Sequence, residues 1–393
     1  MRFKQKKQPN IYLDYASSTP IHEEVKSVYI DAFSLFENPS SIYIGGEKAN
    51  NALREARSGI ARLAHVRANE VYFTSGATES NNIVIRGLKR KGHIVTSTIE
   101  HASVREPIVW LEKNGWQVTW VSPDETGHIH RSDVIAALRD DTVLVSLIYV
   151  QNEIGTIQDV SSIARAILKH YDGRERPLIH TDASQGQMLQ TIDMTALRVD
   201  ALTLSSHKVY GPRGVGALVL KVPRVLDPLI MGGGHERGLR AGTPNVAGAI
   251  AFARALARVQ KNKDHERERL GHLKDHLVQL LSQSISHYHI NGTQDTSAHI
   301  INISIDGISG EQVVIELDVR GVSLATGSAC SNEIDAPATV REVYGALRAE
   351  SSIRISMGLH TKESDLDYFV KVLIPIVLKL RTQKKFGSVT LST

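Results

Sequence analysis

Short β-branched runs alternate with amphipathic helical patterns through the first two thirds of this chain. The runs are five to nine residues long, which is the usual length of a strand. This order predicts an α/β fold, a mostly parallel central sheet with helices on both faces. The strand-like runs are EVYFTSG, HIVTS, WQVTWVS, TVLVSLIYV, PLIHTDAS, DALTLSS and GALVL, and the helical patterns include SNNIVIRGLKRK, VREPIVWLEKNG, RSDVIAALRD and DVSSIARAILKHY.

A change of pattern near residue 246 indicates a second, smaller α+β domain. A helical stretch rich in Ala, Leu, Arg and Lys continues to about residue 282, and the runs HIINISI, VSLAT and SSIRISM follow it with helical segments between and after them. We therefore expect a large domain over residues 22–250 and a small domain formed by residues 1–21 and 251–393.

The composition indicates a soluble globular enzyme. Of the 393 residues 41% are hydrophobic and 22% are charged, and much of the formal net charge of +4 lies in the terminal segments, so we expect no nucleic-acid partner. No apolar run approaches the roughly 20 residues that cross a bilayer, and no apolar signal segment follows the basic N-terminus. We therefore expect a cytoplasmic protein without a membrane partner. The single cysteine, Cys330, excludes an internal disulfide and a cysteine-cluster metal site, and we expect no metal.

The stretch ALTLSSHKVYGPRGVGALVL, residues 201–220, places a lysine at the end of a strand-like run. Lys208 follows Ser205 and His207 and precedes a glycine-rich turn. Ligands of an open parallel sheet bind outside the carboxyl ends of its strands, so this amine is expected to face a ligand. The glycines do not indicate a dinucleotide site, because they precede a strand and do not open a helix.

Two other strand ends also carry polar groups. Gly76, Ala77 and Thr78 form a glycine turn where a helix should begin, and the free N–H groups there could hold a phosphate. An ordinary helix cap explains the same residues equally well. His101 follows the run HIVTS and could lie against a ring or move a proton, although a structural histidine is the alternative.

The next strand ends supply an amide, a carboxylate and a second amide. Asn152 could bond a ligand oxygen or serve a turn. Asp182 needs a partner if it is buried, with helix capping as the alternative, and Gln185 follows three residues later. An amine, a carboxylate, an imidazole and a phosphate cradle at the ends of one sheet are the groups that a pyridoxal 5'-phosphate enzyme requires.

The chemistry of this coenzyme suggests a role for each group. The Lys208 amine would form a Schiff base with the aldehyde, and the Asp182 carboxylate would keep the ring nitrogen protonated so that the ring withdraws electrons. The remaining candidates are Gln185 for the ring oxygen, His101 for the ring face, and Thr78, Ser205 and His207 for the phosphate, beside Gly76 and Ala77.

Nine blocks of the sequence, in order, resemble the cysteine desulfurases of the NifS/IscS type in the class V aminotransferase family. The similarity begins at Ile11 with IYLDYASSTP and runs nearly to the last helix. It implies the fold type I of pyridoxal phosphate enzymes and a homodimer with the active site at the subunit interface, where Thr243 would reach the coenzyme phosphate of the partner. The blocks are ENPSS, FTSGATESNN, TIEHASV, QNEIGTIQD, HTDASQ, SSHKVYGPRGVGAL, GGGHERGLRAGT, TGSAC and SSIRIS.

The resemblance also implies a reaction, the conversion of L-cysteine to L-alanine. Arg354 would clamp the substrate carboxylate as a bidentate pair, with Asn152 at the same end. Lys208 or His101 would move protons, and the Cys330 thiolate would take the substrate sulfur as a persulfide. An iron–sulfur scaffold or another sulfur-acceptor protein would then receive the sulfur. The small, polar residues around Cys330 favour an accessible loop over the buried position usual for a lone thiol.

Some positions depart from the family pattern, and other functions stay open. A selenocysteine lyase or another class V enzyme would not need Cys330, and a catalytically silent scaffold would need neither Cys330 nor Lys208. The departures are Tyr43 where a histidine is common, Leu359 where an arginine is frequent, Ala325 and Thr326 in place of two serines, and a tail after Lys385 without the acceptor-docking extension of some members.

Overall fold

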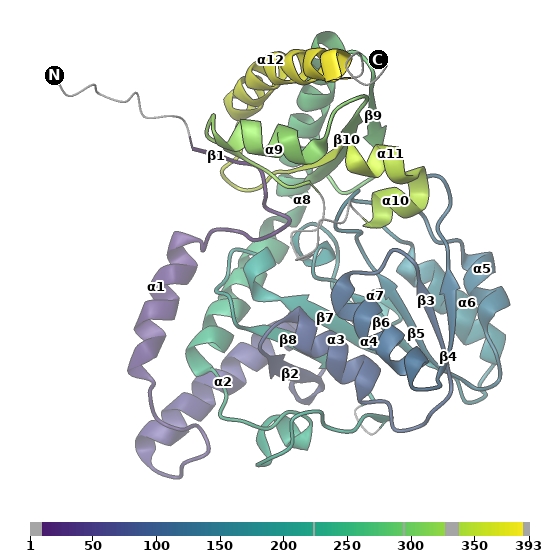
Figure 1. Ribbon diagram of the computed structural model, residues 1–393. Helices are drawn as coiled ribbons and strands as arrows, with labels where there is room; N and C mark the ends of the chain where they lie inside the picture. The colour runs from purple at the N-terminus through teal and green to yellow at the C-terminus, as the bar shows by residue number, and fades with distance from the viewer. Residues whose placement is uncertain (1–9, 223–224, 294, 327–337, 388–393) are drawn as a thin grey trace.

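The computed structural model describes residues 10–222, 225–293, 295–326 and 338–387 of the chain. In this part of the chain the strands form three sheets, of seven, three and two strands. Figure 1 shows the largest sheet in the lower half of the molecule, with the smaller sheets above it.

The central sheet contains all seven strands that the sequence predicts, in the order β2-β8-β7-β6-β5-β3-β4. Four of its pairings are parallel, and only the two made by β8 are antiparallel. The prediction of a mostly parallel sheet is therefore confirmed. The strands are β2 (Val71–Thr74), β3 (His93–Ser97), β4 (Gln117–Val121), β5 (Thr142–Ile148), β6 (Leu178–Asp182), β7 (Ala201–Ser205) and β8 (Gly216–Leu220).

Helices cover both faces of this sheet because successive residues of each strand point to opposite sides. In β3, Ile94 packs with the helices α3 and α4, whereas Val95 belongs to the core shared with α2, α6 and α8. In β6, Leu178 belongs to the same cluster as Ile94, and Ile179 belongs to the same core as Val95. The helices of this part are α1 (Glu23–Asp31), α2 (Ile44–Leu63), α3 (Ala77–Arg86), α4 (Ala102–Lys113), α5 (Arg131–Ala137), α6 (Val160–Tyr171) and α7 (Met194–Leu197), with short 3-10 turns η1 (Ala32–Ser34), η2 (Ala68–Glu70), η3 (Gly186–Met188), η4 (Ser206–Lys208) and η6 (His235–Gly238).

The second half of the chain builds a three-stranded antiparallel sheet in the order β12-β10-β9. The short strand β1 (Ile11–Tyr12) pairs with β11, so the N-terminal segment joins this part of the molecule. The strand β9 is absent from the sequence prediction. The elements are α8 (Val246–Ser284), β9 (Tyr288–Asn291), β10 (Ile300–Ile305), α9 (Gly310–Asp318), β11 (Val322–Ser323), α10 (Ala338–Tyr344), α11 (Ala346–Glu350), β12 (Ser352–Ser356) and α12 (Glu363–Gly387).

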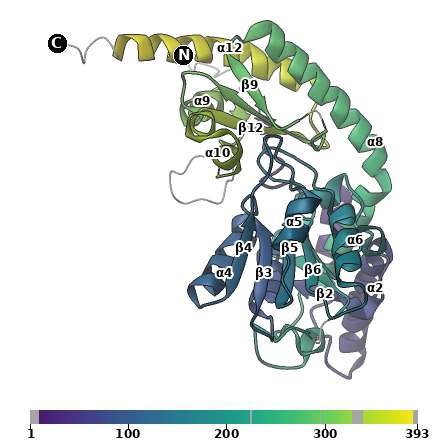
Figure 2. The same cartoon turned by 90° about the vertical axis from the view of Figure 1, so that its right-hand side faces the viewer.

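The long helix α8 connects the two halves. It packs against α1 and α2 beside the large sheet and against α12 beside the small one, and Figure 2 shows it along one side of the molecule. The expected domain boundary at residue 250 falls inside α8, and the division into two domains stays a prediction. No helix among the described residues is both long and apolar enough to cross a membrane.

Candidate active site

A cavity of about 430 Å³ lies at the carboxyl ends of the parallel strands, where ligands of such sheets bind. The chain segment Ala16–Ser18 and Arg354 of β12 also line it. Every predicted site residue except Cys330 and Thr243 contributes to its wall. Cys330 lies outside the described residues, and Thr243 is exposed in the loop before α8. The predicted residues in the wall are Gly76, Ala77, Thr78, His101, Asn152, Asp182, Gln185, Ser205, His207, Lys208 and Arg354.

One end of the cavity is formed by the first turn of α3. Gly76 is the N-cap residue and supplies no side-chain cap, so the first N–H groups of the helix have no partner within it. A Cβ built on Gly76 would meet no atom within 4 Å. Gly216 of β8 makes this close packing possible, because a Cβ there would lie 2.8 Å from the Cα of Gly76.

The same end carries a hydroxyl and an imidazole. The Ser205 Oγ is buried, and no residue in the described part of the chain forms a hydrogen bond with it. Burial, and then the charges of Lys208 and Arg213, lower the pKa of His207 to about 4, so its imidazole is neutral at pH 7. A neutral donor, an unpartnered hydroxyl and the start of a helix together suit a phosphate group.

Asp182 ends β6 and is held by three donors. Its Oδ1 accepts bonds from the Ser184 backbone N–H at 2.9 Å and the Ser184 hydroxyl at 2.5 Å, and its Oδ2 accepts one from the Asn81 amide at 2.7 Å. Charge-assisted bonds of this kind stabilise a buried carboxylate. The bond from the Ser184 N–H is a local turn contact. Asp182 is not the N-cap of a helix, and it lines the cavity.

His101 combines the two roles that its sequence position left open. It is the N-cap of α4, where its Nδ1 accepts a bond from the Ser103 backbone N–H at 3.1 Å, and it also lines the cavity. Burial lowers its pKa, Asp182 raises it, and Lys208 and Arg354 lower it to a smaller extent. The net effect lowers the pKa of His101, which favours the neutral imidazole with a free site for a proton.

Glu100, next to His101, is a buried acid below the cavity. Its Oε1 accepts bonds from the Ser97 hydroxyl at 2.5 Å and the Ile148 backbone N–H at 2.9 Å, while its Oε2 has no hydrogen-bond partner within the described ranges. Burial and the nearby charge of Asp182 raise the pKa of Glu100 to about 8. The Glu100 carboxyl is therefore protonated at pH 7.

Lys208 ends the turn η4 after β7 and meets the N-terminal segment. Its Nζ donates to the backbone carbonyl oxygens of Ala16 and, at 2.7 Å, of Ser17. Thr19 also connects this segment to η4, since its hydroxyl donates to the His207 carbonyl at 2.9 Å. The N-terminal segment thus forms part of the cavity wall opposite the sheet.

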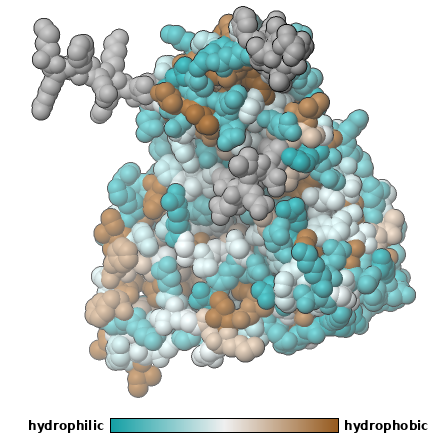
Figure 3. Space-filling view, viewed as in Figure 1, coloured by the Kyte–Doolittle hydropathy of each residue, from teal (hydrophilic) through white to brown (hydrophobic). Residues whose placement is uncertain are grey.

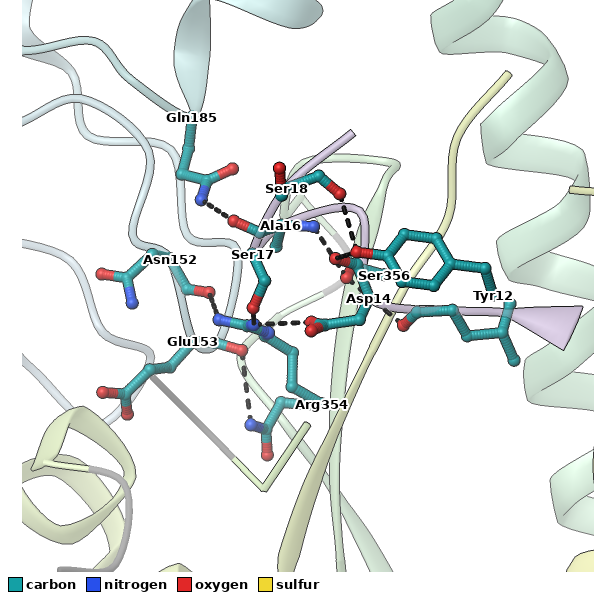
Figure 4. Close-up of polar contacts among 12 residues, drawn as sticks. Tyr12, Asp14, Ala16, Ser17, Ser18, Asn152, Glu153, Gln185, Arg354 and Ser356 are labelled. Carbon is teal, nitrogen blue, oxygen red and sulfur yellow. Dashed lines mark hydrogen bonds and ion pairs between the residues drawn. The ribbon is translucent and has the colours of Figure 1, made fainter. Parts of the chain in front are cut away.

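Arg354 is 2% exposed, although it carries a full positive charge. Its guanidinium donates to the Asn152 carbonyl at 2.9 Å, the Asp14 carboxylate at 2.9 Å and the Ser17 hydroxyl at 3.1 Å (Figure 4). Asn152 therefore meets Arg354 through its backbone, and the residue also lines the cavity.

Gln185 is oriented by a histidine that the sequence prediction did not include. The Gln185 amide donates to the Ala16 carbonyl at 2.8 Å, and the Gln185 Oε1 lies 3.4 Å from His299 Nε2. Burial lowers the pKa of His299 to about 3, so the ring is neutral. Because the Ser297 hydroxyl lies 2.7 Å from His299 Nδ1, a proton on Nε2 satisfies both contacts.

The comparisons with known proteins agree with this arrangement. The family model of the class V aminotransferases matches residues 11–369. The chain belongs to the class V aminotransferase family. Within it, the chain is 40% identical over 381 residues to cysteine desulfurase IscS of Dictyoglomus turgidum, with 95% of both chains covered. It is 37% identical to cysteine desulfurase IscS of Pseudomonas putida, with 94% of this chain and 93% of the relative covered.

Solved structures give the same result for this class V chain. A NifS-like protein superposes with a TM-score of 0.88 at 30% identity and covers 94% of this chain and 100% of its own. A structure described as SspA in complex with cysteine superposes with a TM-score of 0.77 at 32% identity. It covers 88% of this chain and 98% of its own. The resemblance to the NifS/IscS type is therefore confirmed across nearly the whole chain.

Proposed function

We propose that this chain is a pyridoxal 5'-phosphate-dependent cysteine desulfurase that converts L-cysteine to L-alanine and transfers the sulfur to Cys330. The cavity carries this proposal, because the Lys208 amine, the Asp182 carboxylate, the His101 imidazole and the Arg354 guanidinium reach it from four separate elements. Lys208, Asp182 and His101 follow strands of the large sheet, whereas Arg354 comes from β12. The similarity to IscS proteins supports the same reaction.

The coenzyme fits the residues that line the cavity. The open first turn of α3 and the unpartnered Ser205 Oγ offer donors for a phosphate. When bound, pyridoxal phosphate supplies an electron sink for bonds at the substrate carbon atoms. Lys208 would hold its aldehyde, Asp182 its ring nitrogen, His101 its ring face, Gln185 its ring oxygen, and Gly76, Ala77, Thr78, Ser205 and His207 its phosphate.

The chain's own groups would bind the substrate and move its protons. Arg354 and Asn152 would hold the carboxylate of L-cysteine at the end of the cavity opposite the phosphate site. His101 is neutral because burial lowers its pKa, so its imidazole can accept a proton. Lys208, held beside the Ala16 and Ser17 carbonyls, is the amine that can return one.

Cys330 would receive the sulfur. Its thiolate attacks the substrate sulfur, an S–S bond forms, and the C–S bond breaks with its electron pair left on the carbon skeleton, which takes up a proton and leaves as alanine. The persulfide then passes its outer sulfur to an acceptor. We propose an iron–sulfur scaffold or another sulfur-acceptor protein for this role, and a cytoplasmic location.

We also propose a homodimer. A corner formed by α1, α2 and the loop between them exposes large apolar side chains, with Phe36 at 84%, Ile42 at 102% and Ile44 at 75% of full exposure. Figure 3 shows apolar surface gathered over this corner, at the lower left. A contiguous exposed apolar surface is typical of a protein interface. Thr243 is also exposed, as expected of a residue that reaches the coenzyme of a partner subunit.

The test incubates the purified holoenzyme with L-cysteine and a thiol reductant and follows sulfide and alanine together. We expect equal amounts of both from the unaltered chain. The Cys330→Ala variant should lose sulfide release while its coenzyme absorbance still changes on adding cysteine. Equal turnover in the two proteins would contradict the role of Cys330 and favour a selenocysteine lyase or another class V enzyme.

A further inference from the structure

The hydrogen bonds of Arg354 leave little room for a substrate carboxylate. Its Nη2 donates both to the Asp14 carboxylate and to the Ser17 hydroxyl, and its Nη1 donates to the Asn152 carbonyl. Its Nε is buried and has no hydrogen-bond partner among the described residues. Figure 4 shows the guanidinium with Asp14 and Ser17 on one side and the Asn152 carbonyl on the other.

A bidentate pair with Arg354 requires a hydrogen on Nη2. A guanidinium offers a carboxylate two planar forks, one from Nε and Nη2 and the other from Nη1 and Nη2. Both forks include Nη2, and both of its hydrogens are engaged, one with Asp14 and one with Ser17. An incoming carboxylate must therefore replace one of these two acceptors.

Ser17 is the acceptor that gives way more easily. It is neutral and lines the cavity, whereas Asp14 is charged and forms an ion pair with Arg354. A bond between two charged groups is roughly twice as strong as one to a neutral acceptor. The substrate carboxylate would thus take the place of the Ser17 hydroxyl, while Asp14 remains on the same guanidinium.

The backbone around Asp14 is fixed from both sides. Asp14 forms a β-bridge with Ser356 of β12, and the Ser356 Oγ accepts a bond from the Ala16 backbone N–H at 2.9 Å. The Tyr12 hydroxyl lies 3.0 Å from the Asp14 carbonyl and 2.8 Å from the Ser18 carbonyl. These contacts hold the Asp14 carboxylate beside Arg354, so a bound substrate carboxylate shares the arginine with a resident negative charge.

We infer that Asp14 is a specificity-determining residue that lowers the affinity of Arg354 for the substrate carboxylate. This inference rests on the proposed function, because it assigns the substrate carboxylate to Arg354. Asp14 neutralises a buried arginine in the absence of substrate, and it repels the second carboxylate when substrate binds. The resident carboxylate thus weakens the binding of both the amino-acid substrate and the amino-acid product.

The test compares L-alanine with L-alaninamide, which lacks the carboxylate, in the holoenzyme and in the Asp14→Asn and Ser17→Ala variants. Binding is followed by the coenzyme absorbance, and the thermal midpoint is measured with and without alanine. Asp14→Asn keeps an oxygen acceptor for Nη2 but removes its charge. We expect it to bind alanine about tenfold more tightly, with alaninamide affinity unchanged and a larger stabilisation by alanine. Ser17→Ala should tighten alanine binding by less, about twofold to threefold.

The outcomes separate this inference from the proposed function. Equal or weaker alanine binding by Asp14→Asn, or an equal gain for alanine and alaninamide, would overturn the role of Asp14 while the proposed function stands. If alanine does not bind to the unaltered holoenzyme, the proposed function fails, and the inference fails with it.

Discussion

The two walls of the cavity are built in different ways. The sheet wall consists of residues at or shortly after the ends of strands β2, β3, β5, β6 and β7. The outer wall consists of Ala16–Ser18 and Arg354. Asp14, just before this segment, meets Arg354 across 340 positions of the chain. Lys208 and Gln185 of the sheet wall donate across to the backbone of the outer wall. Asp182 and His101 are held in part by neighbours in sequence, Ser184 and Ser103 respectively. The outer wall instead depends on a balance of charges between distant segments.

The sheet wall should show the largest effect of a single substitution. We expect Lys208→Ala to lower sulfide and alanine production by at least about 1000-fold, because no other amine lies in the described cavity wall to replace it. Thermal unfolding should show that the variant is folded. Lys89→Ala, which alters an exposed lysine paired with Asp227, is the control and should keep its activity. A Lys208→Ala variant with more than a tenth of the native rate would refute this assignment.

The outer wall should respond mainly through substrate affinity. We expect Arg354→Lys to raise the KM for cysteine about 100-fold with a smaller change in kcat, because lysine cannot form the bidentate pair. Steady-state kinetics measure both constants. Arg213→Lys is the matched control, because Arg213 also lines the cavity but is exposed. A fall in kcat at constant KM would place Arg354 away from the substrate carboxylate.

Glu100, a buried acid next to His101 of the sheet wall, should make stability depend on pH. The pKa of Glu100 is raised to about 8 in the folded chain, so from pH 4.5 to 8 the folded state keeps a proton that the unfolded state loses. Stability therefore falls as pH rises through this window. Glu100→Gln should remove that slope and be more stable than the native chain at pH 8 by on the order of 3 kcal/mol. Urea unfolding at pH 5 and pH 8 measures the free energy of unfolding of both proteins. The same change between the two pH values in the native chain and in the variant would contradict a protonated Glu100.

The smallest effect is expected where the two walls meet. His299 lies beside β10 and contacts Gln185 of the sheet wall. We expect His299→Leu to weaken coenzyme binding to the apoprotein about fivefold, since Gln185 loses its orienting donor. His299→Gln can donate a similar bond and should restore most of the affinity. Because burial lowers the pKa of His299 to about 3, the difference should not change between pH 6 and 9, and a strong pH dependence would argue against a neutral donor.

The same contrast explains what the sequence could predict. All seven strands of the large sheet and the residues that end them follow from local patterns, since alternation and strand-end polarity are encoded within a few residues. Asp182, His101 and Lys208 were found in this way, and the structure places them in one cavity.

The outer wall could not be predicted from local patterns. Asp14 belongs to the block IYLDYASSTP, but no periodicity says that it will meet Arg354 across the molecule. The role of His299 could not be predicted from local sequence either, because it depends on a contact with Gln185, 114 positions away. The only local signal for Asp14 is its charge within a short apolar run. This signal does not identify the residue that Asp14 pairs with.

Helix α8 has a mechanical consequence for the distance between the walls. Its 39 residues span about 58 Å at the rise of an α-helix, and its two ends pack beside different sheets. Because a helix resists bending and twisting, α8 fixes both the distance and the relative rotation between the part of the molecule that carries Arg354 and the part that carries Lys208. Removing one residue from its middle would rotate one half by about 100° against the other. The length of this helix is therefore as much a part of the site as the side chains that line it.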